Sequence, residues 1–239
     1  MAIENIEQGT LPAHIKAVIA LTSWKKRINT VGLTIFNLRC VCGRDFHIVL
    51  TLAEEEFPRK EQELPEDLMR MNRVGIFEIL WVKENWKSFK KVLFAMQKYP
   101  TMPIISADDD CLYRYNYAKE LYLIWIYKPS FFVTYYTVSW LGKHITGGYA
   151  TLYPPNVFKK YTTILNHNTM RQQILDCHED DCLYACLRAK LNKTHIMCLK
   201  KEYQEVAVSH DEISPLHELY QGDIWKHHLE TMCSIVNPL

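Results

Sequence analysis

The alternation of apolar runs with helical segments in the first 110 residues constrains the fold more than any other feature of this sequence. Strands are predicted where β-branched and other apolar residues gather, at 15–21, 46–52, 76–82 and 103–107. Helices are predicted between these strands, over 30–41, between Pro65 and Gly75, and over 89–99. Ser88 is expected to cap the last of them. This alternation is typical of an α/β fold with a mostly parallel central sheet flanked by helices, because parallel strands need crossover connections.

The second half of the sequence is less regular. Helices are predicted over 115–127 and 180–193, and extended segments over 131–137 and 195–200. Residues 145–155 combine two glycines with a double proline, which predicts a loop with a short strand. Because no repeat, low-complexity tract or linker interrupts the chain, we expect a single domain over residues 1–239.

Composition and charge exclude several classes of protein. A formal net charge of +1 argues against a general nucleic-acid binder, which would show a basic excess. The sequence shows neither a signal peptide nor an apolar stretch long enough for a transmembrane helix. Among the eight cysteines, Cys182 and Cys186 lie one helical turn apart in apolar surroundings, which favours reduced core thiols over a metal site or a disulfide. A soluble, cytoplasmic protein is therefore expected.

Three consecutive aspartates, Asp108 to Asp110, follow the fourth predicted strand. Ligands of open α/β sheets bind at the carboxyl ends of the strands, so this is a suitable position for a site. Strand alternation favours Asp108 and Asp110 on one face, where two carboxylates can hold Mg²⁺ or Mn²⁺. The alternative is a solvated turn without a ligand.

A second acidic cluster, Glu179-Asp180-Asp181, opens the helix predicted from residue 180. Acidic residues in a first helical turn complement the helix dipole, which is one explanation. The other is that one of these carboxylates acts as a general base. The local sequence favours neither.

Six segments occur in an order that resembles bacterial glycosyltransferases with the GT-A fold, of the family 2-like type that contains a DxD motif. They are "VIALTSWKKRI", "LAEEEFP", "LPEDL", "IISADDDCLY", "GGYATLYPP" and "EDDCLYACL". The resemblance covers roughly residues 15–190 and implies a single GT-A, Rossmann-like domain. Its nucleotide-sugar half would span about 13–112 and its acceptor half about 113–239.

The resemblance also implies roles for individual residues. The donor-binding residues would be Thr22, Ser23, Arg27, Lys90, Asp108 and Asp109. The metal would be held by Asp110 and Asp108, with His210 as a candidate third ligand. Gly147 and Gly148 would approach the sugar or acceptor, and Asp181 would be the catalytic base, with Asp180 as the fallback. For Lys90 and Lys91 a solvated position is favoured over a phosphate contact, and for His210 an ordinary surface position is favoured.

By this resemblance the protein is a metal-dependent glycosyltransferase that uses Mn²⁺ or Mg²⁺ and moves a sugar from a UDP-linked donor. The acceptor would be a glycan or lipid-linked hydroxyl in polysaccharide biosynthesis, reached from the cytoplasm or the inner face of the membrane, with inversion at the anomeric carbon. The alternative is an inactive domain of this fold that binds a nucleotide or glycan. A haloacid-dehalogenase phosphatase is disfavoured because Leu112 stands where that motif needs Thr or Val.

Overall fold

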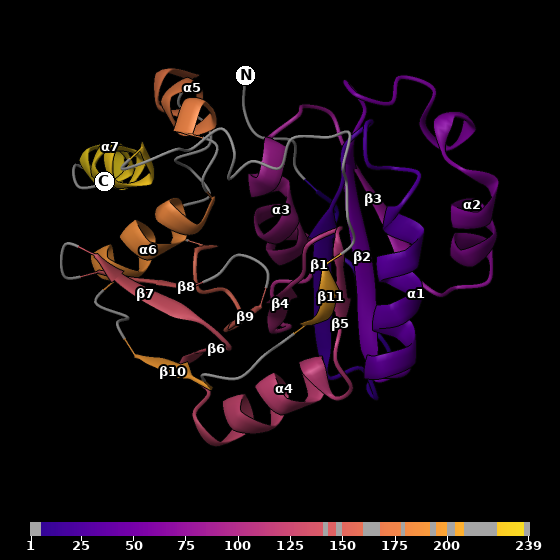
Figure 1. Ribbon diagram of the computed structural model, residues 1–239, viewed down its shortest axis with the longest axis horizontal. Helices are drawn as coiled ribbons and strands as arrows, with labels where there is room; N and C mark the ends of the chain where they lie inside the picture. Colours follow the sequence, from indigo (N-terminus) through magenta and orange to yellow (C-terminus); the bar gives the residue numbers. More distant parts are fainter. Residues whose placement is uncertain are drawn as a thin grey trace.

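A central sheet organises the chain (Figure 1). The computed structural model describes residues 6–140, 143–146, 150–159, 168–177, 180–191, 195–199, 204–207 and 224–236. Within these residues the sheet has seven strands in the order β10-β6-β9-β4-β1-β2-β3. Their bounds are β1 Ala17–Thr22, β2 Phe46–Ala53, β3 Glu78–Val82, β4 Ile104–Ser106, β6 Phe132–Thr134, β9 Thr151–Tyr153 and β10 Ile196–Cys198. Strand β1 pairs in parallel with β2 and β4, and β2 with β3, whereas β9 runs antiparallel between β4 and β6. The predicted mostly parallel α/β fold is confirmed.

Helices cover both faces of this sheet (Figure 1). Alternate residues of β1 enter two different apolar clusters: Val18 and Ala20 pack in one, Ala17 and Ile19 in the other. The first cluster includes residues of α3 (Lys90–Lys98), α5 (Asn168–Cys177), α6 (Asp180–Lys190) and α7 (Ile224–Val236). The second includes residues of α1 (Val31–Cys42), α2 (Glu66–Arg73) and α4 (Tyr117–Tyr127). This alternation is the period of two that a strand buried on both faces must have.

The start of α3 differs from the prediction. The helix begins at Lys90, directly after the 3₁₀ turn η2 (Lys87–Phe89), and Ser88 lies inside η2 without capping the helix. Another 3₁₀ turn, η1 (Lys60–Glu63), precedes α2. The Ser88 hydroxyl instead hydrogen-bonds to the Asp180 carboxyl. Ser88 is therefore used to hold a distant segment and not to begin the helix.

Two small two-stranded sheets were not anticipated. Strand β5 (Cys111–Tyr113), directly after the aspartates, pairs antiparallel with β11 (Gln204–Ala207). The extended segment predicted over 131–137 divides into β6 and the start of β7 (Thr137–Trp140), which forms a hairpin with β8 (Lys143–Thr146). The partner of β5 lies some ninety residues away along the chain, and such a long-range pairing leaves no local signal in the sequence.

The cysteines also depart from the expectation. Cys186 on α6 and Cys233 on α7 form a disulfide, so the expectation of a reduced thiol is wrong for Cys186, whereas Cys182 is a buried thiol as expected. The two helices pack against one another, which brings together cysteines that are 47 residues apart. Among the described residues, no helix is both long and apolar enough to cross a membrane.

Candidate active site

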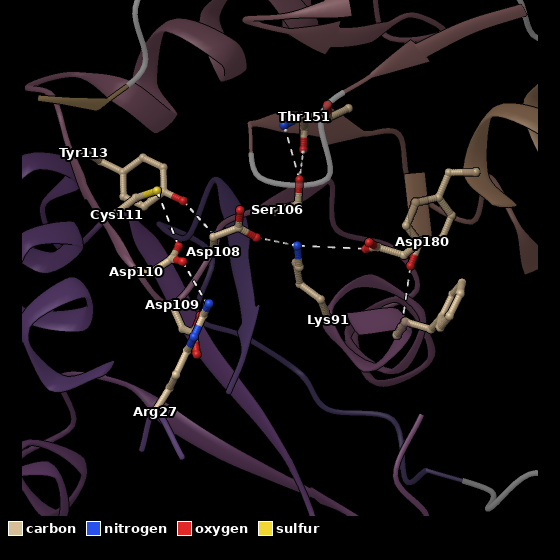
Figure 2. Close-up of polar contacts among 12 residues, drawn as sticks. Arg27, Lys91, Ser106, Asp108, Asp109, Asp110, Cys111, Tyr113, Thr151 and Asp180 are labelled. Carbon is tan, nitrogen blue, oxygen red and sulfur yellow. Dashed lines mark hydrogen bonds and ion pairs between the residues drawn. The ribbon is translucent and has the colours of Figure 1, made fainter. Parts of the chain in front are cut away.

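The loop after β1 meets the aspartates that follow β4, because these two parallel strands are neighbours and their carboxyl ends lie side by side. Ser23 Oγ donates to Asp109 Oδ2 at 2.5 Å. Arg27 Nη1 lies 3.1 Å from Asp109 Oδ1 and 2.8 Å from Asp110 Oδ2 (Figure 2). Two of the residues expected near the donor are thus brought to the aspartates by the strand order itself.

Asp109 points inward and anchors the acidic turn. It is buried, and Thr34 Oγ1 on α1 donates to its backbone carbonyl at 3.0 Å. Burial raises the pKa of its carboxyl, and the hydrogen bond from Ser23 and the charge of Arg27 work against that rise. Asp109 is therefore engaged by the protein, whereas its two neighbours stay partly exposed.

Asp108, Asp110 and Cys111 form a candidate metal site. Among the described residues, one potential ligand atom from each lies within 4.8 Å of the other two. Carboxylate oxygens are the ligands that Mg²⁺ and Mn²⁺ prefer, so Asp108 and Asp110 fit such an ion. Cys111 was missed in the sequence, although it directly follows the aspartates. Burial raises the pKa of its thiol, and the charges of Asp108 and Asp110 raise it further.

Lys91 on α3 connects this acidic turn to the second acidic cluster (Figure 2). Its Nζ lies 2.7 Å from Asp108 Oδ1 and 3.9 Å from Asp180 Oδ2 at the start of α6. Burial by itself lowers the pKa of Lys91, but the carboxylates of Asp108 and Asp180 outweigh it and the net pKa is raised. Two acidic segments some seventy residues apart in the sequence thus face one buried ammonium group.

The two acids that open α6 lie in different surroundings. Asp180 is buried, and burial raises the pKa of its carboxyl. The charge of Lys91 and the hydrogen bond from Ser88 lower this pKa, but the effect of burial is larger and the net pKa is raised. Asp181 is only partly buried. Its charge acts on Lys91, Tyr153 and Arg188, so it faces the same region.

Other predicted site residues contact different groups or lie outside the described residues. Lys90 is buried, and its Nζ contacts Glu56 Oε2 at 3.0 Å and Asn85 Oδ1 at 2.7 Å. Burial lowers the pKa of Lys90, and the charges of Glu56 and Asp109 oppose that fall. The interpretation of Lys90 and Lys91 as solvated is wrong, since both side chains are buried. Thr22 Oγ1 donates to the Thr51 carbonyl at 2.7 Å. Gly147, Gly148 and His210 lie outside the described residues.

The local sequence carries no signal for a buried Lys91. Val92, Leu93 and Met96 of α3, together with the preceding Phe89, are buried in the core. These apolar positions define one face of the helix, and Lys90 and Lys91 both fall on the opposite face, so the helical period predicts both as exposed. Their burial depends on the elements that pack against that face, which only the tertiary structure shows.

Comparison with known proteins shows which solved structures share this fold. No family model matches the chain, and no curated protein matches it. Among 67 matching chains of solved structures is the crystal structure of S. aureus TarS 1–349, a glycosyltransferase with a GT-A-like fold. The two structures share 13% sequence identity with a TM-score of 0.54, over 92% of this chain and 72% of the TarS chain. At this identity the likeness shows the fold alone: the chain has the α/β fold of a glycosyltransferase.

Proposed function

We propose that the protein is a metal-dependent glycosyltransferase that moves a sugar from a nucleotide-sugar donor to a hydroxyl group of its acceptor. One observation carries this proposal. Two acidic clusters, Asp108 to Asp110 and Asp180-Asp181, converge beside Lys91 at the carboxyl edge of a glycosyltransferase-like sheet. Packing alone gives no reason to gather five carboxylates, because their negative charges repel one another.

The acidic turn is the proposed donor site, in the half that spans about 13–112. Asp108 and Asp110 would hold Mn²⁺ or Mg²⁺, and Cys111 lies close enough to contribute a ligand. When bound, the ion supplies a positive charge that stabilises the departing diphosphate. Arg27 can donate in two directions, which suits a phosphate or uracil contact of a UDP-linked donor.

The start of α6 is the proposed acceptor side, in the half that spans about 113–239. Asp180 is engaged by Lys91 and Ser88, so we assign the general base to the more exposed Asp181. Its carboxylate takes the proton of the acceptor hydroxyl, the oxygen attacks the anomeric carbon, and the bond to the diphosphate breaks with inversion. Gly147 and Gly148 are proposed for the acceptor or sugar contact. A glycan or lipid-linked acceptor at the cytoplasmic face of the inner membrane is proposed as the partner.

Calorimetric titration with UDP tests this function. With Mn²⁺ present, we expect binding to the wild-type protein and to Asp181→Asn, and loss of binding in Asp110→Ala or after EDTA. Asp181→Asn should nevertheless transfer sugar about 10²- to 10⁴-fold more slowly than the wild type from any UDP-sugar that the wild type uses, since this is the usual contribution of a general base.

Two outcomes would contradict the proposal. Metal-independent binding of UDP, or equal binding by Asp110→Ala, would remove the donor-site assignment. Donor binding without transfer or donor hydrolysis, with a wide panel of sugars and acceptors, would favour the alternative of a domain that only binds nucleotide or glycan.

A further inference from the structure

Each of the three consecutive aspartates already contacts a cationic side chain of the protein. Arg27 Nη1 lies within 3.1 Å of Asp109 and 2.8 Å of Asp110, and Lys91 Nζ lies 2.7 Å from Asp108. The Asp108 side chain is 31% exposed, whereas that of Lys91 is only 5% exposed. A metal ion reaching Asp108 from solvent therefore meets an ammonium group fixed behind the carboxylate.

Lys91 cannot easily withdraw from this position. Its side chain extends from the first turn of α3, which packs against β1, β2 and β4. On its other side lies the Asp180 carboxylate, 3.9 Å away and itself buried. Moving the ammonium group away would leave buried carboxylates without their counter-charge, which is costly. Its positive charge therefore stays in the site whether or not a metal ion is bound.

We propose that Lys91 is a positioning residue, a built-in counter-ion of Asp108 that weakens binding of a bare divalent cation and so couples uptake of the cation to the diphosphate. This inference rests on the proposed function. The repulsion between Lys91 and the divalent cation opposes binding of the cation alone. A diphosphate offsets it, because the phosphates bring negative charge and add oxygen ligands to the ion. Cation and diphosphate then strengthen one another's binding, and by linkage they do so equally.

Mn²⁺ titrations, followed through the electron paramagnetic resonance signal of the free ion, test the inference with and without UDP. Lys91→Met should bind Mn²⁺ alone about tenfold more tightly than wild type, since it removes one positive charge beside the ion. The gain in Mn²⁺ affinity that UDP brings should shrink in the same variant. Lys91→Arg keeps the charge and should restore both values.

Lys98→Met is the matched control for charge. It removes one lysine from the other end of the same helix, where Lys98 Nζ pairs with Glu78 Oε1 at 2.9 Å. We expect its Mn²⁺ affinity to equal that of the wild type. An unchanged or weaker affinity of folded Lys91→Met for Mn²⁺ alone would overturn the inference, because a residue that merely orients Asp108 would lower metal affinity when removed.

A second pair of variants guards the test against misfolding. Lys91→Met leaves the buried Asp180 carboxylate without its cation, so a double variant that carries both Lys91→Met and Asp180→Asn is compared with Asp180→Asn alone. Tighter Mn²⁺ binding by the double variant supports the inference, and unchanged binding overturns it. If UDP does not bind while Lys91→Met still tightens Mn²⁺ binding, the proposed donor is wrong and the counter-ion inference stands. No Mn²⁺ binding in any variant would overturn both.

Discussion

Three identical residues in a row take three different roles at the scale of single side chains. Asp109 is buried against Ser23 and Arg27, Asp108 contacts Lys91, and Asp110 shares Arg27 while staying partly exposed. All three lie in the turn between β4 and β5, which directs Asp109 inward and leaves Asp108 and Asp110 partly exposed. Asp109 is therefore a structural carboxylate, and its neighbours are the ones available to a ligand.

Asp109→Ala should be strongly destabilising. Removing one member of a buried ion pair leaves Arg27 without one of its two carboxylates and costs about 3 kcal/mol or more. In a chain of this length that corresponds to a fall of roughly 6–12 °C in melting temperature, measured by differential scanning calorimetry. Asp110→Ala is the control and should melt within a few degrees of the wild type. Equal losses in both variants would contradict the separation of roles.

At the scale of elements, Glu78 ties two strands and a helix together at the amino ends of the strands. It begins β3 and contacts His47 of β2 at 2.7 Å, Lys98 of α3 at 2.9 Å and the Tyr99 hydroxyl. Burial alone would raise its pKa, but the hydrogen bonds from His47, Tyr99 and Lys98 lower the pKa to about 2. This edge holds the scaffold together, opposite the edge that carries the acids.

The pKa of Glu78 predicts a specific loss of stability in acid. Its pKa in the folded protein lies below the ordinary value of 4.5, so its contribution to stability is complete above about pH 4.5 and is lost as the pH falls through 2. The shift corresponds to about 3 kcal/mol. Urea unfolding of wild type and Glu78→Gln should differ by that amount at pH 6 and converge toward pH 2. Glu66→Gln, which removes an exposed ion pair to Arg73, should show almost no difference at any pH. A constant gap between wild type and Glu78→Gln across this range would contradict the prediction.

At the scale of the whole molecule, the second half of the chain places the candidate base against the first half. Helix α6 carries Asp180 and Asp181, packs against α7 and joins it through Cys186 and Cys233. The same apolar cluster contains residues of α3, which carries Lys91. The position of the base relative to the donor site therefore depends on helices far apart in the sequence.

Breaking the disulfide should loosen this arrangement. Closing a loop with a sequence separation of 47 residues is expected to stabilise the folded protein by about 4 kcal/mol through the entropy of the unfolded chain. For the wild type and for Cys40→Ser, which removes an exposed thiol outside the disulfide, the melting temperature should be lower with a reducing agent than without it. Cys233→Ser should melt at the lower temperature in both conditions. A reductant effect that persists in Cys233→Ser would contradict the assignment.

Much of the fold could be predicted from local patterns. Strands β1, β2, β3 and β4 and helices α1, α2, α4 and α6 all lie at the predicted segments, because their apolar periods are set by their own residues. The position of Asp108 to Asp110 after β4 follows from the same reasoning, since a parallel sheet gathers the carboxyl ends of its strands at one edge.

The partners of these residues were decided only by the tertiary structure. The antiparallel insertion of β9, the pairing of β5 with β11 and the Cys186–Cys233 disulfide join segments distant in sequence, and no local period encodes such pairings. For the same reason the sequence marked both acidic clusters but not Lys91, which brings them together. The sequence pattern around a residue determines which helix or strand it joins, whereas the charge that its side chain pairs with depends on how the helices and strands pack.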